Sequence, residues 1–241
     1  MRRAMGFLTV LGGAASPSAG AVPWFPVVGA LLGLAVGGVW VGAGHVWPPA
    51  AAAAVTVAVD AILTGGLHLD GLVDSGDGLV PALPRERRLE VMSDPHVGAF
   101  GVITLVVVML VRFGAFAAGP AVVWPVAGLW CGSRSAVAVL LLLGRYARST
   151  GLATLFGGGD VIRHRRVAAI VIAVVGLGAS LAGLLVRRPG HGAAALAAEL
   201  FVMLGITAFA YRRLGGYTGD VLGAQIVIGE TAGLLVWATR W

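Results

Sequence analysis

The amino-acid sequence predicts an all-α fold, a polytopic integral membrane helical bundle of about seven transmembrane helices (range six to eight) in one domain over residues 1–241. Only 12% of the residues are charged and 58% are hydrophobic, with a mean hydropathy of +0.92. Soluble domains carry about a quarter charged residues. Apolar runs of about 20 residues, the length that crosses a bilayer, also recur along the chain. The lipid bilayer is therefore the expected surrounding of this protein.

Reading the apolar runs against the polar breaks predicts seven spans. They are Val22–Val41, Ala50–Leu67, Phe100–Ala118, Ala121–Leu143, Val167–Val186, Ala193–Tyr211 and Val221–Ala238. The second run is the least regular, because it contains Asp60 and ends in glycines. The third and fourth runs are separated only by Gly119 and Pro120.

The charge pattern orients these spans. The sequence contains no lysine, and Arg2 and Arg3 place the N-terminus inside, because short basic loops stay in the cytoplasm. With seven spans, the same side holds Arg85, Arg87, Arg88, Arg145, Arg148, Arg163, Arg165, Arg166, Arg212 and Arg213. Arg187, Arg188 and Arg240 disagree, since they fall outside. No continuous basic face interleaved with polar or aromatic side chains exists, which excludes a nucleic-acid partner.

Two features of the sequence carry less weight. Cys131 is the only cysteine, so neither an intrachain disulfide nor a cysteine metal cluster can form. The opening residues, MRRAMGFLTVLGGAASPSAG, imitate a secretory signal peptide, but a short amphipathic segment lying on the membrane has the same pattern. We expect the interfacial segment, and the sequence leaves cleavage open.

The most informative stretch is LTGGLHLDGLVDSGDG, Leu63 to Gly78. On a helix, Asp70, Asp74 and Asp77 are spaced i, i+4, i+7 and share one face. Neighbouring carboxylates repel one another at low dielectric unless a cation neutralises them. An all-oxygen site indicates Mg²⁺ or Mn²⁺ rather than zinc. A solvated loop outside the membrane is the alternative, and His68 fits a structural role as well as a catalytic one.

These residues resemble the hallmark of the cobalamin synthase (adenosylcobinamide-GDP ribazoletransferase) family, T-G-G-x-H-x-D-G-x-x-D-x-x-D-G. The match has no departure and consists of Thr64, Gly65, Gly66, His68, Asp70, Gly71, Asp74, Asp77 and Gly78. The stretch LGGYTGDVLGAQIVIGE, Leu214 to Glu230, is similar to the family's second segment, G-G-x-T-G-D-x-L-G-A-x-x-x-x-x-E. Two motifs in the expected order identify the chain as a member of this family.

The resemblance implies an enzyme that transfers the activated phosphate of adenosylcobinamide-GDP onto α-ribazole or its 5′-phosphate. GMP is released, and this is the final nucleotide-loop assembly step of cobalamin biosynthesis. The implied cofactor is Mg²⁺. The implied location is the cytoplasmic membrane of a prokaryote, with the active site on the cytoplasmic side.

Under this hypothesis Asp70, Asp74 and Asp77 hold one or two Mg²⁺ ions on the diphosphate. One of these carboxylates, or His68, accepts the proton of the attacking hydroxyl. Phosphoryl transfer consists mostly of positioning and charge neutralisation, so cationic side chains are also expected.

Further candidates for substrate binding are Arg145, Arg148, Arg134, Thr218, Asp220 and Glu230. Arg145 and Arg148 lie at a cytoplasmic break, where simple anchoring of the helix ends is the alternative role. Thr218 also suits a helix N-cap. Glu230 lies about 15 Å deeper than Asp220, where an acid is usually functional or paired. Arg112 and Arg134 are the candidate partners of Glu230.

Two other functions are weighed. A CDP-alcohol phosphatidyltransferase-like enzyme also uses clustered aspartates, but its D-G-x-x-A-R start is absent because Leu72, Val73 and Asp74 follow Gly71. An ion-coupled transporter would line a path with Asp60, Glu230 and the intramembrane arginines, but the sequence shows no inverted repeat. The sequence assigns no role to Asp60, and it leaves a homo-oligomer open.

Overall fold

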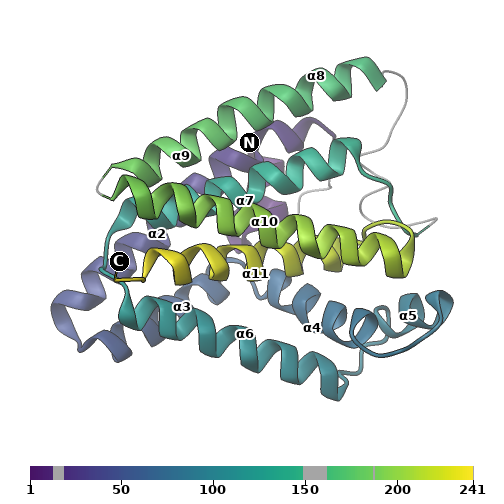
Figure 1. Ribbon diagram of the computed structural model, residues 1–241, viewed down its shortest axis with the longest axis horizontal. Helices are drawn as coiled ribbons and strands as arrows, with labels where there is room; N and C mark the ends of the chain where they lie inside the picture. The colour runs from purple at the N-terminus through teal and green to yellow at the C-terminus, as the bar shows by residue number, and fades with distance from the viewer. Residues whose placement is uncertain (13–18, 149–161, 187, 241) are drawn as a thin grey trace.

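The computed structural model describes residues 1–12, 19–148, 162–186 and 188–240 (Figure 1). Within these residues the chain is helical and contains no β-strand, only an isolated bridge between Tyr146 and Tyr217. Arg187, one of the arginines that disagree with the predicted orientation, lies outside the described residues.

Six helical segments of the described chain are long and apolar enough to cross a membrane. They are Gly20–Val46 (η2, Ala19–Trp24, running into α2, Phe25–Val46), α6 (Ala99–Ala118), α7 (Val123–Leu143), Val167–Leu185 (α8, Ile162–Ile172; η4, Ala173–Leu177; α9, Gly178–Leu185), α10 (Pro189–Leu214) and α11 (Gly219–Trp237). A seventh span forms if α3 (Pro49–Leu63) and α4 (Leu67–Leu79) are taken together. The predicted integral membrane bundle is confirmed at six to seven spans.

Three short helices complete the described chain: α1 (Arg2–Leu8), η1 (Val10–Gly12) and α5 (Arg85–Val91). Helix α1 packs on α2, where Phe7 stacks on Phe25 with 5.7 Å between the ring centroids. The N-terminal residues therefore contribute to the packed structure.

The second predicted span, Ala50–Leu67, differs from the structure. Helix α3 ends at Leu63, and the chain turns by 92° into α4. Gly65 and Gly66 adopt φ values of 61° and 70°, a left-handed conformation that costs other residues about 1–2 kcal/mol. The Thr64 hydroxyl donates to the Asp60 carbonyl at 2.9 Å and ends α3. The Thr-Gly-Gly part of the motif thus builds a bend that hydropathy alone does not reveal.

Helices α7 and α11 form the centre of the bundle and are mostly buried. Figure 1 shows α7, α10 and α11 side by side, and α2 packs along α7. The close contact of α2 with α7 depends on glycine: a methyl group at Gly33 would lie 2.6 Å from the Val126 carbonyl oxygen. Small residues at such positions let membrane helices approach backbone to backbone.

The bend provides the first prediction. Replacing Gly66 with alanine (Gly66→Ala) should lower stability by about 1–2 kcal/mol, because a side chain there is strained by the left-handed backbone alone. Thermal unfolding in detergent, followed by circular dichroism, measures the loss. Gly38→Ala, on an exposed and uncrowded position of α2, is the matched control and should not lower the midpoint, because alanine favours a helix over glycine. Equal midpoints for the two variants would contradict the assigned role of the bend.

Candidate functional site

The polar end of the bundle is held together by arginines that bind backbone carbonyls. Arg85 on α5 donates from Nε to the Leu214 carbonyl at 2.7 Å and from Nη2 to the Ala147 carbonyl at 3.0 Å. Buried Arg88 donates from Nη1 to the Gly78 carbonyl at 2.7 Å, where α4 ends. Cationic side chains at helix C-termini satisfy carbonyls that lack a partner in the helix. The ends of α4 and α10 and the segment that follows α7 are thereby held by α5.

The two sequence motifs meet where α4 crosses the start of α11. A methyl group at Gly71 would lie 2.7 Å from the Asp220 carbonyl oxygen, and one at Gly223 would lie 3.2 Å from the Cα of His68. Each helix therefore contributes a glycine to the contact. The carboxylates of α4 come to face the first turn of α11 for this reason.

The acidic residues at this crossing come from both motifs. Asp70 is exposed and Asp74 is half-buried. Asp74 lies in the electrostatic field of Asp220, of Asp70 and of the opposite charge of Arg148. The Arg148 Nη2 atom lies 3.2 Å from Asp220 Oδ2. Asp220 thus joins the first two aspartates of the first motif.

Asp220 owes its position to the cap of α11. The Thr218 hydroxyl accepts a hydrogen bond from the Val221 backbone N–H at 3.3 Å and lies 3.2 Å from Asp220 Oδ2. Thr218 is completely buried. As the N-cap of α11, it also orients Asp220.

Asp77 lies further along the same face of α4, near enough to act electrostatically on Asp74, and its carboxylate is also bound by backbone groups. It is 8% exposed, and its two oxygens accept hydrogen bonds from the backbone N–H groups of Gly98 (2.7 Å) and Gly101 (2.8 Å) at the start of α6. The spacing did place the aspartates on one face. Because α11 covers one end of that face and α6 covers the other, the third carboxylate serves as a helix cap.

A cavity of about 100 Å³ opens beside Asp70 and Asp220. His68 lines it, and apolar side chains of α1, α7 and α11, among them Phe7, Val137 and Ile226, complete its wall. His68 Nε2 is buried and has no hydrogen-bond partner. The cavity therefore combines an acidic edge, an imidazole and an apolar wall.

The two arginines predicted after α7, Arg145 and Arg148, differ in their surroundings. Arg145 is exposed, and its backbone is held by Tyr211 and Tyr217. Arg148 is half-buried and donates from Nη2 to the Met92 carbonyl at 3.1 Å as well as pairing with Asp220. Arg145 is thus placed to reach an anion in solution, and Arg148 links the α5–α6 loop to the acidic site.

The α5–α6 loop carries an exposed Asp94–His96 pair, with 2.6 Å between Asp94 Oδ1 and His96 Nδ1. The backbone and ring N–H groups of His96 hold the pKa of Asp94 below its ordinary value. Within the described residues, no three histidine, cysteine, aspartate or glutamate side chains converge as a ready-made metal-binding group.

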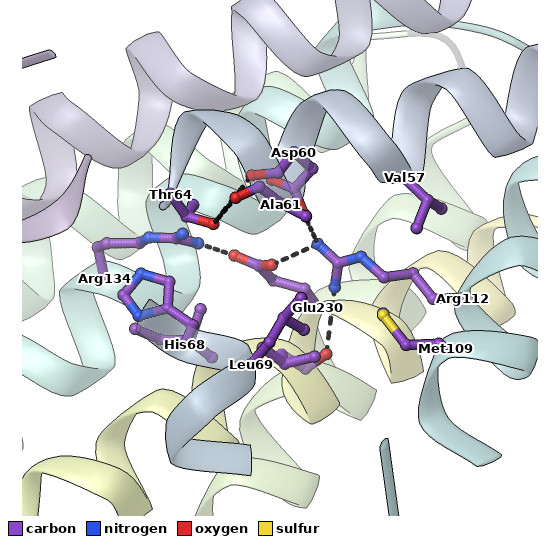
Figure 2. A pocket seen from close by; sticks show the side chains of 12 residues that line it. Val57, Asp60, Ala61, Thr64, His68, Leu69, Met109, Arg112, Arg134 and Glu230 are labelled. Carbon is purple, nitrogen blue, oxygen red and sulfur yellow. Dashed lines mark hydrogen bonds and ion pairs between the residues drawn. The ribbon is translucent and has the colours of Figure 1, made fainter. Parts of the chain in front are cut away.

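Deeper in the bundle lies what we call the buried charge cluster: Asp60, Arg112, Arg134 and Glu230 (Figure 2). Arg112 Nη2 lies 2.6 Å from Asp60 Oδ2 and 2.9 Å from Glu230 Oε2, and Arg134 pairs with the other Glu230 oxygen. The side chains of Arg112, Arg134 and Glu230 are at most 2% exposed. The cluster joins α3, α6, α7 and α11.

Uncharged neighbours complete the cluster. The Trp130 indole N–H donates to Asp60 Oδ1 at 3.1 Å, and the Arg112 guanidinium lies 4.6 Å from the Trp130 ring centroid. The Ser133 hydroxyl donates to Glu230 Oε1 at 2.9 Å. Pairing of Glu230 with Arg112 and Arg134 follows the expectation from sequence. The sequence assigns no role to Asp60. The only sign of its part in the cluster is that it is an acidic residue inside an apolar run.

The fold and the site define a polytopic membrane protein with a carboxylate-lined cavity at one end of its helical bundle. A model of the cobalamin-5-phosphate synthase family matches residues 1–238, and the chain belongs to this family.

Curated relatives agree with this family. A protein of Citrobacter koseri is 40% identical over 88% of this chain and 84% of its own length. One of Chlorobium phaeobacteroides is 36% identical over 98% of this chain and 94% of its own length. One of Escherichia coli K12 is 36% identical over 88% and 84%. All three are named adenosylcobinamide-GDP ribazoletransferase. No solved structure matches the chain.

The position of Asp77 provides the second prediction. Asp77→Ala should lower stability by about 1 kcal/mol or more, since α6 loses both acceptors at its start. Asp70→Ala, at an exposed position of the same helix, should leave stability unchanged. Thermal unfolding in detergent compares the two variants. A larger loss for Asp70→Ala would contradict the capping role of Asp77.

Proposed function

We propose that this protein joins adenosylcobinamide-GDP to α-ribazole, or to α-ribazole 5′-phosphate, with release of GMP. The names of the relatives supply the reaction. The observation that supports it most directly is the contact of α4 with α11 at Gly71 and Gly223, which brings the acids of both family motifs to one cavity.

The proposed reaction is a phosphoryl transfer. A ribose hydroxyl of α-ribazole attacks the phosphorus that carries the corrinoid, and a new P–O bond forms. The P–O bond to GMP breaks, and the bonding electrons leave with the GMP phosphate. The hydroxyl proton passes to a base of the protein. Such chemistry requires alignment of the two substrates and neutralisation of the diphosphate charge.

Asp70, Asp74 and Asp220 supply the acidic edge in this proposal. Their oxygen-only donors fit Mg²⁺, which commonly binds one or two carboxylates together with waters and substrate phosphates. A ready-made cage of three ligands is therefore not required. Each oxygen of Asp77 accepts one backbone hydrogen bond, so we assign Asp77 to the support of α6 and the metal contact to the other three carboxylates. Bound Mg²⁺ would neutralise the negative charge of the diphosphate and the charge that develops on the phosphate of the leaving GMP.

The cationic and basic roles fall to three other residues. Exposed Arg145 binds the diphosphate from the aqueous side, and Arg148 holds Asp220 in place. His68 is the proposed proton acceptor, because it lines the cavity with Asp70 and its Nε2 has no partner in the protein.

Arg134, Thr218 and Glu230 are expected from sequence to bind substrate, and we assign them positioning roles instead. Each is at most 1% exposed, and each binds other groups of the protein. A substrate would have to displace those partners to reach them.

We also propose that the site faces the cytoplasm. The cavity lies at the end of the bundle that carries Arg85, Arg88, Arg145 and Arg148, and short basic segments remain on the cytoplasmic side. This arrangement would give the site direct access to soluble α-ribazole.

Turnover provides the third prediction. Purified protein in detergent or lipid, given adenosylcobinamide-GDP, α-ribazole and Mg²⁺, should release GMP. Asp74→Asn should reduce release at least about a hundredfold, because a charge-stabilising group at the reacting phosphate is lost. Glu90→Gln, at an exposed position of α5, is the matched control and should retain activity. Absence of GMP with the unaltered protein would overturn the proposed function, and full activity of Asp74→Asn would remove that residue from the site.

Metal removal provides the fourth prediction. Chelation with EDTA should abolish GMP release, and added Mg²⁺ should restore it, because the acidic edge repels a diphosphate in the absence of a cation. Mg²⁺ should also raise the thermal midpoint of the unaltered protein more than that of Asp74→Asn. Turnover that persists in excess EDTA would contradict the metal requirement.

A further inference from the structure

The buried charge cluster lies next to the bend that begins α4. Asp60 is four residues before Thr64, whose hydroxyl bonds the Asp60 carbonyl, and Gly65 and Gly66 follow. Asp60 also binds Arg112 of α6 and Trp130 of α7. The last turn of α3 is therefore fixed to two other helices immediately before the chain turns.

The other half of the cluster fixes α11. Glu230 accepts from Arg112 on α6 and from Arg134 on α7, and Ser133 donates to it as well. Arg112 also donates to the Val227 carbonyl and to the Thr231 hydroxyl at 3.2 Å each. One arginine thus connects α3, which precedes α4 in the chain, to α11, on which α4 packs.

His68 connects this cluster to the acidic site. Its side chain lines the small cavity occupied by the cluster as well as the cavity that contains Asp70 and Asp220. Figure 2 shows the His68 ring beside Arg134 at one side of the cluster. His68, at the start of α4, therefore lies beside the charged groups.

We propose that the buried charge cluster is a positioning device for the acidic site, with Glu230 as its central positioning residue. It fixes the angle between α3 and α4, and with it the placement of Asp70 and Asp74 opposite Asp220. The role in turnover rests on the proposed function, whereas the role in fixing the bend does not.

A distance measurement tests the geometry without any substrate. Spin labels on cysteines at Ala54 of α3 and Val80 at the end of α4 report the bend, since both positions are exposed and Cys131→Ser removes the only native cysteine. In Glu230→Gln the distance distribution should broaden or shift, because Arg112 and Arg134 lose their shared anion.

The matched control is Glu199→Gln on α10. Glu199 is as deeply buried as Glu230 and lies in the electrostatic field of Arg134, but the ion pairs of Arg112 and Arg134 are made with Glu230 and Asp60. The same chemical change there should leave the distance distribution narrow. If Glu230→Gln fails to fold, Asp60→Asn takes its place, because it removes the α3 anchor and retains both arginine pairs of Glu230.

Kinetics provide the second measurement. In Glu230→Gln the Mg²⁺ concentration for half-maximal turnover should rise about tenfold, as for loss of residues that orient metal ligands. Unchanged distances and an unchanged Mg²⁺ requirement in folded Glu230→Gln and Asp60→Asn would overturn the proposal, as would equal effects in Glu199→Gln. If the unaltered protein releases no GMP while the distances change as expected, the proposed function fails and the role of the cluster in the bend stands.

Discussion

Two carboxylates and two guanidinium groups form one cluster inside the bundle, in which each charge is neutralised by another. Asp60 and Glu230 balance Arg112 and Arg134, and removal of one partner from such a buried set costs about 3–5 kcal/mol. Each of the four comes from a different helix. The charge balance therefore holds only when α3, α6, α7 and α11 are correctly arranged. It makes this arrangement of the four helices more stable than the alternatives.

The acidic site is built on this arrangement. Helix α4 leaves α3 through two left-handed glycines, so backbone geometry permits the turn but does not fix where α4 comes to lie. Contact with α11 at Gly71 fixes one side of α4, and the carbonyls bound by Arg88 fix its end. Asp70 and Asp74 reach Asp220 because both ends of α4 are held by other parts of the chain.

The sequence predicts most of the membrane architecture, because apolar run length is a direct consequence of bilayer thickness. It does not predict the break in the second run. Hydropathy measures how apolar a run is and not its direction, and Gly65 and Gly66 turn the chain within a run that remains apolar.

The contacts of individual side chains are likewise predictable only in part. An acid at the depth of Glu230 must be paired, so its arginine partners were predictable from two candidates in apolar runs. Helical spacing placed Asp77 on the face of Asp70, but spacing does not say which helix covers each end of that face. Asp77 caps the start of α6, and the start of α11 brings Asp220 close to α4 at Gly71. Contacts between segments distant in sequence are set by packing and not by local pattern.

Helix α4 itself explains why so many contacts converge on it. Glycines at positions 71, 76 and 78 each weaken a helix by about 1 kcal/mol relative to alanine, and three aspartates on one face repel one another. Each glycine is also where a neighbour approaches closely: Asp220 at Gly71, Thr104 at Gly76 and Met92 at Gly78. The residues that make α4 weak as an isolated helix are those that let other elements support it. The position of its carboxylates is therefore determined by the surrounding bundle and not by α4 alone.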